Sequence, residues 1–211
     1  IIVNAMAYTA EDRAEQDPTT ALAVNALAPG LLAQAAQDHG ACLVHYSTDY
    51  VFDGKRSRPY TEEDSTHPLS VYGHSKREGE INVDRACERH MILRTRWVYG
   101  AYGQNFLKTM LRLALERPAL KIVNDQYGAP TGVDLLAQVT VQILQQSLQI
   151  PTAEPTAQPI PQSHPWGLYH VSAAGVTNWY DYAQFVIQSA RERGWPIKPQ
   201  PQDIQGIASS Q

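Results

Sequence analysis

Two residues of this sequence, Tyr72 and Lys76, have side chains and a spacing suited to acid–base chemistry. On a helix, residues four positions apart lie on one face, one turn from each other. A free tyrosine has a pKa of about 10 and is therefore a poor acid–base catalyst at neutral pH. A lysine ammonium beside it favours the phenolate, so the pair predicts a Tyr72 pKa lowered toward the physiological range.

A hydroxyl that could share the same reacting oxygen comes from the segment Ser47-Thr48-Asp49. This segment ends an apolar run typical of a buried parallel strand, and ligands of open α/β sheets bind at the carboxyl ends of such strands. A tyrosine–lysine pair alone is equally typical of an exposed helix face. Thr48 at a strand end is what favours the catalytic interpretation.

The elements that must position these residues alternate between strands and helices, which predicts an α/β protein with a largely parallel sheet. Gly40 ends the first long helix, and Thr19 or Thr20 is the expected cap at its start; Thr131 is the expected cap of a later helix. Apolar runs predict strands over 1–3, 41–47, 91–100, 120–123 and 167–173, and helical periodicity predicts helices over 21–39, 70–88, 105–116, 133–149 and 178–193.

Three segments fall outside this alternation. Residues 53–70 are polar and predict a long loop, and the proline-rich stretch 151–165 predicts an extended surface loop or, as a lesser alternative, a motif for a proline-binding partner. The chain opens on an apolar run as if inside a strand, and its polar end, 201–211, closes no element. We therefore expect a piece of a longer chain.

Composition narrows the class of protein. The 211 residues carry a formal charge of −4 and a pI near 6.0, which argues against nucleic acid as a partner. No uninterrupted apolar run reaches the roughly 18 residues of a membrane span. The first residues have neither a basic region nor a cleavage-site pattern, so we do not expect them to be a signal peptide. The two cysteines, Cys42 and Cys87, are too few for a disulfide framework or a four-ligand zinc site. We expect buried thiols and a reducing, cytoplasmic setting.

A longer series of motifs resembles the dTDP-4-dehydrorhamnose reductase family of extended short-chain dehydrogenase/reductases. The segments that carry the resemblance are VNAMAYTAEDRAE (3–15), HYSTDYVFDG (45–54), RPYTEEDSTHPLSVYGHSKREGE (58–80), LRTRWVYG (93–100), NFLKTML (105–111) and DQYGAPT (125–131). The resemblance implies a Rossmann-like, doubly wound fold and hydride transfer from NADPH or NADH to C4 of a dTDP-linked 4-keto-sugar. The implied product is dTDP-L-rhamnose, a precursor of cell-surface polysaccharide.

The resemblance also implies residue roles. Tyr72 would donate a proton to the ketone oxygen, Lys76 would hold the nicotinamide ribose and lower the tyrosine pKa, and Thr48 would polarise the substrate. The implied cofactor-binding residues are Ala7, Tyr8, Thr9, Tyr46, Tyr72 and Lys76, and the implied substrate-binding residues are Thr48, Asp49 and Trp97. No metal is implied.

In domain terms, we expect residues 1–211 to form one partial Rossmann-like domain, with substrate bound mainly by 97–135 and 166–211. One departure from the family is that none of the thirteen glycines forms the glycine-rich turn that receives a cofactor pyrophosphate. The resemblance is therefore to an N-terminally incomplete member. Arg96 replaces a small hydroxyl residue, and Glu11 replaces an apolar one.

Other functions stay open at this point. Dehydratases of the same superfamily place an Asp-Glu pair after the strand-end threonine, whereas here Asp49 is followed by Tyr50. Epimerases reuse the same tyrosine, lysine and threonine. A different class is a non-catalytic regulatory subunit similar to that of methionine adenosyltransferase, whose motif tends to be Ser-Ser-Asp. Homodimerisation is a further option.

Overall fold

The computed structural model describes residues 1–148 and 165–210 and divides the chain into two compact units. Unit 1 comprises Ile1–Thr95 and Gln142–Val171, and unit 2 comprises Arg96–Val141 and Ser172–Gln211. Of the predicted proline-rich loop, residues 151–164 lie outside the described part. Each unit is described by itself.

Unit 1 is built on a parallel sheet with the strand order β1-β2-β3-β8. The strands are β1 (Ile2–Asn4), β2 (Leu43–Thr48), β3 (His90–Thr95) and β8 (Gly167–His170). All three pairings in this sheet are parallel, so the carboxyl ends of the strands meet at one edge. The predicted α/β class with a parallel sheet is confirmed.

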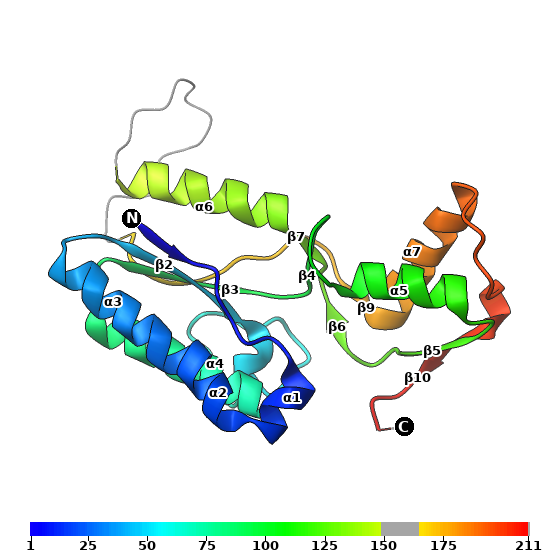
Figure 1. Cartoon of the computed structure of the whole chain (residues 1–211), viewed down its shortest axis with the longest axis horizontal. Coiled ribbons are helices and arrows are strands. Elements are labelled where there is room, and N and C mark those ends of the chain that lie inside the picture. Colours follow the sequence, from blue (N-terminus) through cyan, green and yellow to red (C-terminus); the bar gives the residue numbers. More distant parts are fainter. Residues whose placement is uncertain (149–164, 211) are drawn as a thin grey trace. The chain divides into compact units, whose positions relative to one another are not determined.

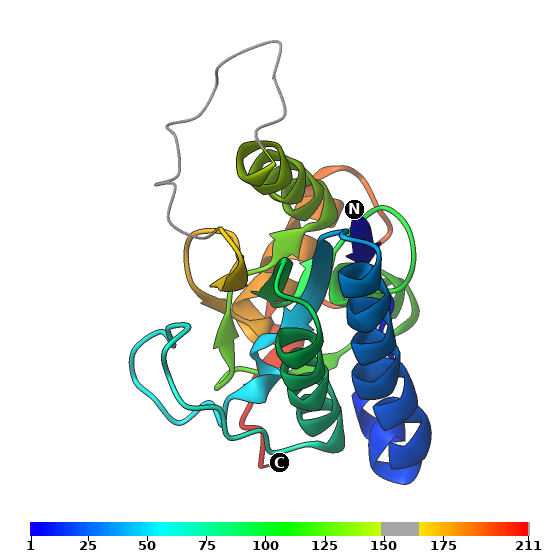
Figure 2. The same cartoon turned by 90° about the vertical axis from the view of Figure 1, so that its left-hand side faces the viewer.

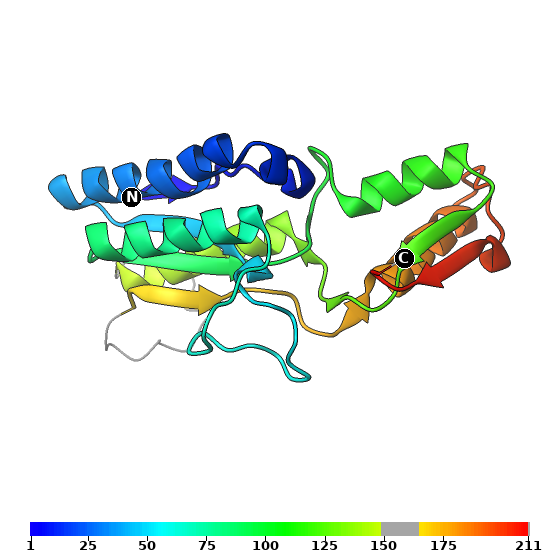
Figure 3. The ribbon, with the colours of Figure 1, turned by 90° about the horizontal axis from the view of Figure 1, so that it is seen from below.

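Helices cover both faces of this sheet (Figure 1). On one face, the helices α3 (Ala28–Asp38) and α4 (Val71–Ala86) pack side by side (Figure 3). On the other face lies α6 (Val133–Ser147), whose C-terminal half belongs to unit 1. Alternate strand residues point to opposite faces: Leu43 and Ile92 pack toward α3 and α4, whereas Val44 and Leu93 pack with Leu144 of α6.

The chain reaches α3 through three short pieces: α1 (Glu11–Gln16), α2 (Pro18–Leu22) and a π-helical turn η1 (Ala23–Leu27). The predicted cap at Thr19 or Thr20 is wrong, because Asp17 caps α2 by accepting the Thr20 N–H at 3.1 Å. Pro18 then occupies the first turn, where its missing N–H costs nothing. The predicted stop at Gly40 is confirmed: its φ is +60° and the helix ends at Asp38.

By length and mean hydropathy alone, the helical stretch Pro18–Asp38 would be able to cross a membrane. Its most apolar window of 18 residues has a mean hydropathy of 1.2, yet its Ala33 and Ala36 are fully buried against the sheet and α4. A buried core helix can have the same length and mean hydropathy as a membrane-spanning helix, so this stretch is weak evidence for a membrane span. Figure 2 shows α3 and α4 together on one side of the sheet.

Unit 2 has its own core between two helices and a small parallel pair of strands. The helices are α5 (Phe106–Glu116) and α7 (Trp179–Glu192), and the pair joins β5 (Leu120–Val123) to β10 (Ile204–Ile207). Met110, Ile122, Ile187 and Ile204 lie in this core. Two shorter pairs complete the unit: β4 (Val98–Tyr99) with β7 (Thr131–Gly132), and β6 (Tyr127–Gly128) with β9 (Thr177–Asn178).

Three sequence predictions need correction here. The expectation that the polar C-terminal segment closes no element is wrong, because β10 pairs in parallel with β5 over four residues. The predicted strand over 91–100 is two strands, β3 and β4, interrupted at Arg96 and Trp97. Thr131 lies in β7 instead of capping α6, and its hydroxyl donates to the Ala129 carbonyl.

Candidate active site

Thr48 and Tyr72 meet at the carboxyl edge of the unit 1 sheet. Thr48 is the last residue of β2, Tyr72 lies in the first turn of α4, and their side chains hydrogen-bond to each other. The Thr48 hydroxyl oxygen accepts the Tyr50 N–H at 3.2 Å. The hydroxyl hydrogen of Thr48 can therefore be donated to the phenolic oxygen of Tyr72. Such a hydrogen bond stabilises a phenolate.

The start of α4 is fixed by a cap and a close backbone approach. Ser70 caps the helix by accepting the Gly73 N–H at 3.1 Å, and Glu15 accepts the Val71 N–H at 2.8 Å. A Cβ at Gly73 would lie 2.3 Å from the carbonyl oxygen of Tyr50. Only glycine lets the first turn of α4 lie this close to η2 (Asp49–Val51), and this closeness brings Tyr72 to Thr48.

Lys76 lies one turn after Tyr72 and is only 2% exposed. Its ammonium donates to the carbonyl oxygen of Tyr46 at 2.6 Å, so the main chain of β2 holds it. Burial lowers the pKa of Lys76 to about 8, and the nearby Glu80 carboxylate opposes that shift. The neighbouring His45 is fully buried, and burial together with the Lys76 charge lowers its pKa to about 3. His45 is therefore neutral at physiological pH.

The Tyr72 pKa runs opposite to the sequence prediction. Burial raises it to about 12; the Thr48 hydrogen bond lowers it, and the carboxylates of Glu11 and Asp49 raise it further. The prediction that Lys76 brings this pKa toward neutrality is wrong for this structure, because burial and the two carboxylates outweigh the Thr48 hydrogen bond, which lowers the pKa. Tyr72 thus keeps its proton across the physiological range.

Glu11 is linked to Tyr72 by the side chain of Tyr50, which contacts both residues. The Glu11 carboxylate and the Tyr50 hydroxyl form a side-chain hydrogen bond, and the Tyr50 and Tyr72 rings meet edge to face at 5.7 Å between centroids. Burial is the largest cause that raises the pKa of Glu11. A negative charge at this position therefore lies near both tyrosines.

The predicted cofactor-binding segment Ala7-Tyr8-Thr9 follows β1 and is held by a buried asparagine. Asn25, fully buried in the π-helical turn η1, accepts the Tyr8 N–H at 2.8 Å and donates to the Tyr8 carbonyl at 3.0 Å. Its amide also donates to Ser75 of α4 at 3.0 Å. Both main-chain groups of Tyr8 are thereby tied to the helix that carries Tyr72 and Lys76.

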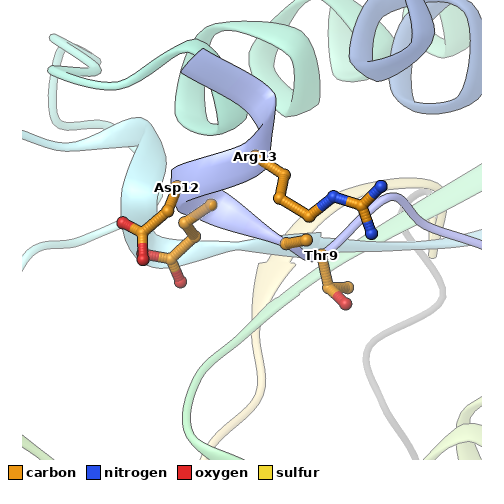
Figure 4. A pocket seen from close by; sticks show the side chains of 5 residues that line it. Thr9, Asp12 and Arg13 are labelled. Atoms are coloured by element: carbon orange, nitrogen blue, oxygen red, sulfur yellow. The ribbon is translucent and has the colours of Figure 1, made fainter. Parts of the chain in front are cut away.

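Next to this segment, residues Thr9 to Arg13 line a shallow pocket of about 320 Å³. Figure 4 shows the Asp12 carboxylate pointing away from the Arg13 guanidinium there. Thr9 and Arg13 give the pocket a hydroxyl and a cation, and Glu11 and Asp12 give it two carboxylates, so the lining carries both signs of charge.

Trp97, the remaining predicted substrate-binding residue, belongs to unit 2. Its φ is +46°, a left-handed backbone conformation that costs energy for a bulky residue. Its ring stacks on Trp179 at 3.6 Å between centroids, and a Cβ at Gly128 would lie 2.7 Å from it. The Arg96 guanidinium lies over the same ring and donates to the Tyr127 carbonyl. The packing of unit 2 thus holds Trp97 in its strained backbone.

The structure brings together Thr48, Asp49, Tyr72, Lys76 and Tyr46, with Tyr8 packed against the same small core as Tyr72. Sequence reasoning missed two polar residues beside them, Asn25 and Glu80. Each left a signal: Asn25 interrupts the apolar face of its helix, and Glu80 extends the spacing of Tyr72 and Lys76 by another four residues. Within residues 1–148 and 165–210, no group of three or more His, Cys, Asp or Glu side chains is arranged to hold a metal ion.

Comparisons with known proteins show the family to which the chain belongs. Residues 1–211 match the family described as the RmlD substrate binding domain. The chain is 47% identical over 197 residues to dTDP-4-dehydrorhamnose reductase of Escherichia coli K12, covering 93% of this chain and 62% of that protein. The corresponding Salmonella typhimurium protein is also 47% identical over 194 residues, covering 92% and 61%.

Among solved structures, dTDP-4-dehydrorhamnose reductase from Bacillus anthracis in complex with NADP matches with a TM-score of 0.84 and 34% identity. That match covers 99% of this chain and 66% of the other. The predicted Rossmann-like fold is confirmed by this similarity, and the chain spans about three fifths of the length of the curated relatives named above. From the match over its whole length, the chain belongs to the RmlD substrate binding domain family.

Proposed function

We propose that this chain carries the reducing site of an NAD(P)H-dependent dTDP-4-dehydrorhamnose reductase. Its substrate would be dTDP-4-dehydro-L-rhamnose and its product dTDP-L-rhamnose, for the synthesis of cell-surface polysaccharide. The observation that carries the proposal is the hydrogen bond between Thr48 and Tyr72, with the Lys76 ammonium one helical turn away. Relatives of this chain bear the same activity in their names.

The residues around Lys76 suit the nicotinamide ribose of such a cofactor. An ammonium has three donor hydrogens, and the Tyr46 carbonyl takes one, so the others can bind ribose hydroxyls. Asn25 fixes the backbone of Tyr8, so the Ala7–Thr9 segment can lie along the cofactor as a rigid wall. The thirteen glycines of the chain form no glycine-rich turn that could receive the cofactor pyrophosphate. We therefore propose binding residues only for the nicotinamide end of the cofactor.

When bound, NADPH or NADH supplies the hydride, which no side chain can provide. Tyr72 does the acid–base work: with a pKa of about 12 it is protonated, and it donates its proton to the C4 oxygen as negative charge develops there. Thr48 then stabilises the tyrosine oxygen by donating its hydroxyl hydrogen. Lys76, protonated below a pKa of about 8, adds positive charge on the same face.

The cysteines bear on the cellular setting of the proposed enzyme. Cys42 and Cys87 are free and buried, which supports a reducing, cytoplasmic setting. Beyond the dTDP-linked sugar, a second copy of the chain is the partner that we would look for, by measuring the molar mass in solution.

The test is NADPH oxidation with dTDP-4-dehydro-L-rhamnose, measured on the protein from the full reading frame and on the 211-residue chain. We expect turnover with dTDP-L-rhamnose as product, identified by mass and NMR spectra, in the full-frame protein. The regulatory-subunit alternative predicts no turnover and a stable complex with methionine adenosyltransferase, and that pair of results would overturn the proposal. An epimerised 4-keto-sugar without net NADPH use would instead identify an epimerase.

A further inference from the structure

Glu80 lies on the same face of α4 as Tyr72 and Lys76, one more turn along the helix, and is 1% exposed. Its carboxylate is fully engaged. It accepts hydrogen bonds from Ser47 Oγ at 2.6 Å, Arg94 Nε at 2.7 Å, Arg94 Nη2 at 2.7 Å and Arg77 Nη1 at 3.1 Å. Such bidentate, charge-assisted pairs are the most directional that side chains make.

The partners of Glu80 come from the strand ends that carry the site. Ser47 directly precedes Thr48 on β2. Arg94 on β3 is the residue that pairs with Ser47 in the sheet register. The Arg94 guanidinium lies 5.0 Å from the centroid of the Phe52 ring, which holds its plane. One carboxylate on α4 is thus tied to two adjacent strands, beside the residue whose hydroxyl meets Tyr72.

We propose that Glu80 is a positioning residue for the reduction: it fixes α4 against β2 so that Tyr72 stays hydrogen-bonded to Thr48 and Lys76 to the Tyr46 carbonyl. This inference rests on the function proposed above. A buried ion pair is often no more stabilising than apolar side chains of equal volume. What the pair adds here is a fixed angle and distance between the helix and the strand ends.

Glu80 also acts on Lys76 by its charge, since its carboxylate opposes the loss of the lysine proton. Other titratable groups surround the two side chains. They are His45 and Tyr46 of β2, Arg94 of β3, His170 of β8, Tyr72 and Arg77 of α4, and, around Tyr72, Glu11 of α1 with Asp49 and Tyr50 of η2. Neutralising Glu80 removes the carboxylate that opposes this loss, so Lys76 gives up its proton at a lower pH.

Four variants separate positioning from folding. Glu80→Gln removes the charge, and Ser47→Ala removes one hydrogen bond while leaving the ion pair intact. The double variant Glu80→Met with Arg94→Met replaces the pair by apolar side chains of similar length, which keeps the fold if the pair is only structural. Glu78→Gln, an exposed glutamate on the same helix, is the matched control.

In the full-frame protein we expect Glu80→Gln and the double variant to lower kcat by about 10- to 100-fold, the effect of small misplacements, with KM for the sugar nearly unchanged. Ser47→Ala should lower kcat less, and Glu78→Gln should have no effect. The alkaline limb of the pH profile should move to lower pH in Glu80→Gln and in the double variant, which both lack the Glu80 carboxylate, and should stay in place in Ser47→Ala and Glu78→Gln. A folded double variant with wild-type kcat would overturn the proposal.

A readout that needs no turnover keeps this test apart from the test of the proposed function. The pKa of Lys76 is followed by NMR on protein with ¹³C-labelled lysine, with the Lys76 signal assigned from its loss in Lys76→Met. We expect a lower Lys76 pKa in Glu80→Gln and an unchanged one in Glu78→Gln. Equal pKa values in wild type and Glu80→Gln would contradict the inference even if the enzyme turns over, and a shift without any turnover would leave only the proposed function at fault.

Discussion

At the scale of the residue, burial decides the chemistry of the site more than neighbouring charge does. Burial raises the pKa of Tyr72 to about 12 and lowers that of Lys76 to about 8. Because both values lie above neutral pH, both groups are protonated there, which is the form that their proposed roles require. The types and spacing of these residues were predictable from the sequence. The direction of the Tyr72 shift was not, because solvent exposure depends on packing by segments far away in the chain.

Lys76 should make the stability of the protein depend on pH. Its folded pKa of about 8 lies below its ordinary value of 10.5, so the folded state binds fewer protons than the unfolded state between those values. Stability therefore rises with pH through that window. Lys76→Met removes the buried ammonium, and its gain in unfolding free energy over wild type should be about 2 kcal/mol larger at pH 7 than at pH 9.5.

Urea unfolding at the two pH values measures this difference. The exposed Lys121→Met serves as control and should show no such pH dependence. Equal effects of Lys76→Met at both pH values would mean that Lys76 titrates normally in the folded protein.

Glu11 offers a second prediction at this scale. Its carboxylate raises the pKa of Tyr72, so Glu11→Val should lower that pKa while leaving it above the physiological range. Labelling tyrosine with ¹³C at Cζ and assigning the signal by its loss in Tyr72→Phe gives the value by NMR titration. If the pKa of Tyr72 stays the same or rises in Glu11→Val, the carboxylate does not act on this tyrosine.

At the scale of the element, local patterns predicted most helices and strands of the chain. The strand over 120–123 and the helix beginning after Ser70 were correct because apolar periodicity and caps are local signals. The strand β10 was missed because its two isoleucines form a strand only by pairing with β5, which lies 84 residues earlier in the sequence. Asn25 and Glu80 escaped for the same reason, since their partners come from other elements.

Helix α4 also depends on a close approach that glycine permits. A Cβ at Gly79 would lie 2.0 Å from the Asn25 carbonyl oxygen, so α4 and η1 cannot keep their spacing with a larger residue. An exposed helical glycine usually gains stability on replacement by alanine. Gly79→Ala should instead lose about 1–3 kcal/mol of unfolding free energy.

Chemical denaturation measures this loss, with Glu78→Ala on the same helix as the control for helix propensity. A stabilised Gly79→Ala variant would show that the two helices can move apart without penalty.

At the scale of the whole molecule, the chain forms two units, each with a core of its own. The sequence suggested one partial domain with substrate bound mainly by 97–135 and 166–211, and that assignment of substrate binding stays a prediction. What local patterns could not show is that unit 2 joins two separate stretches of sequence, one carrying β5 and the other β10. Long-range pairing of this kind carries no local signature.

Separate cores predict separate effects of core substitutions. Ile204 of β10 is 5% exposed within the core of unit 2, so Ile204→Ala should destabilise that unit by about 2–4 kcal/mol. Amide hydrogen exchange should quicken in β5 and α7 but not in β2 and β3. The exposed neighbour Gln205→Ala is the control, and faster exchange throughout unit 1 would contradict independent cores.

The most direct test of the central claim, that Tyr72 is the proton donor of a ketone reductase, is the rate of Tyr72→Phe in the full-frame protein. Removing the hydroxyl keeps the ring packed beside Tyr50 and Ala21, so the fold should persist. We predict a fall in kcat of about 10²- to 10⁴-fold with nearly unchanged NADPH affinity, as expected for loss of a general acid. Turnover of Tyr72→Phe at the wild-type rate would contradict the account.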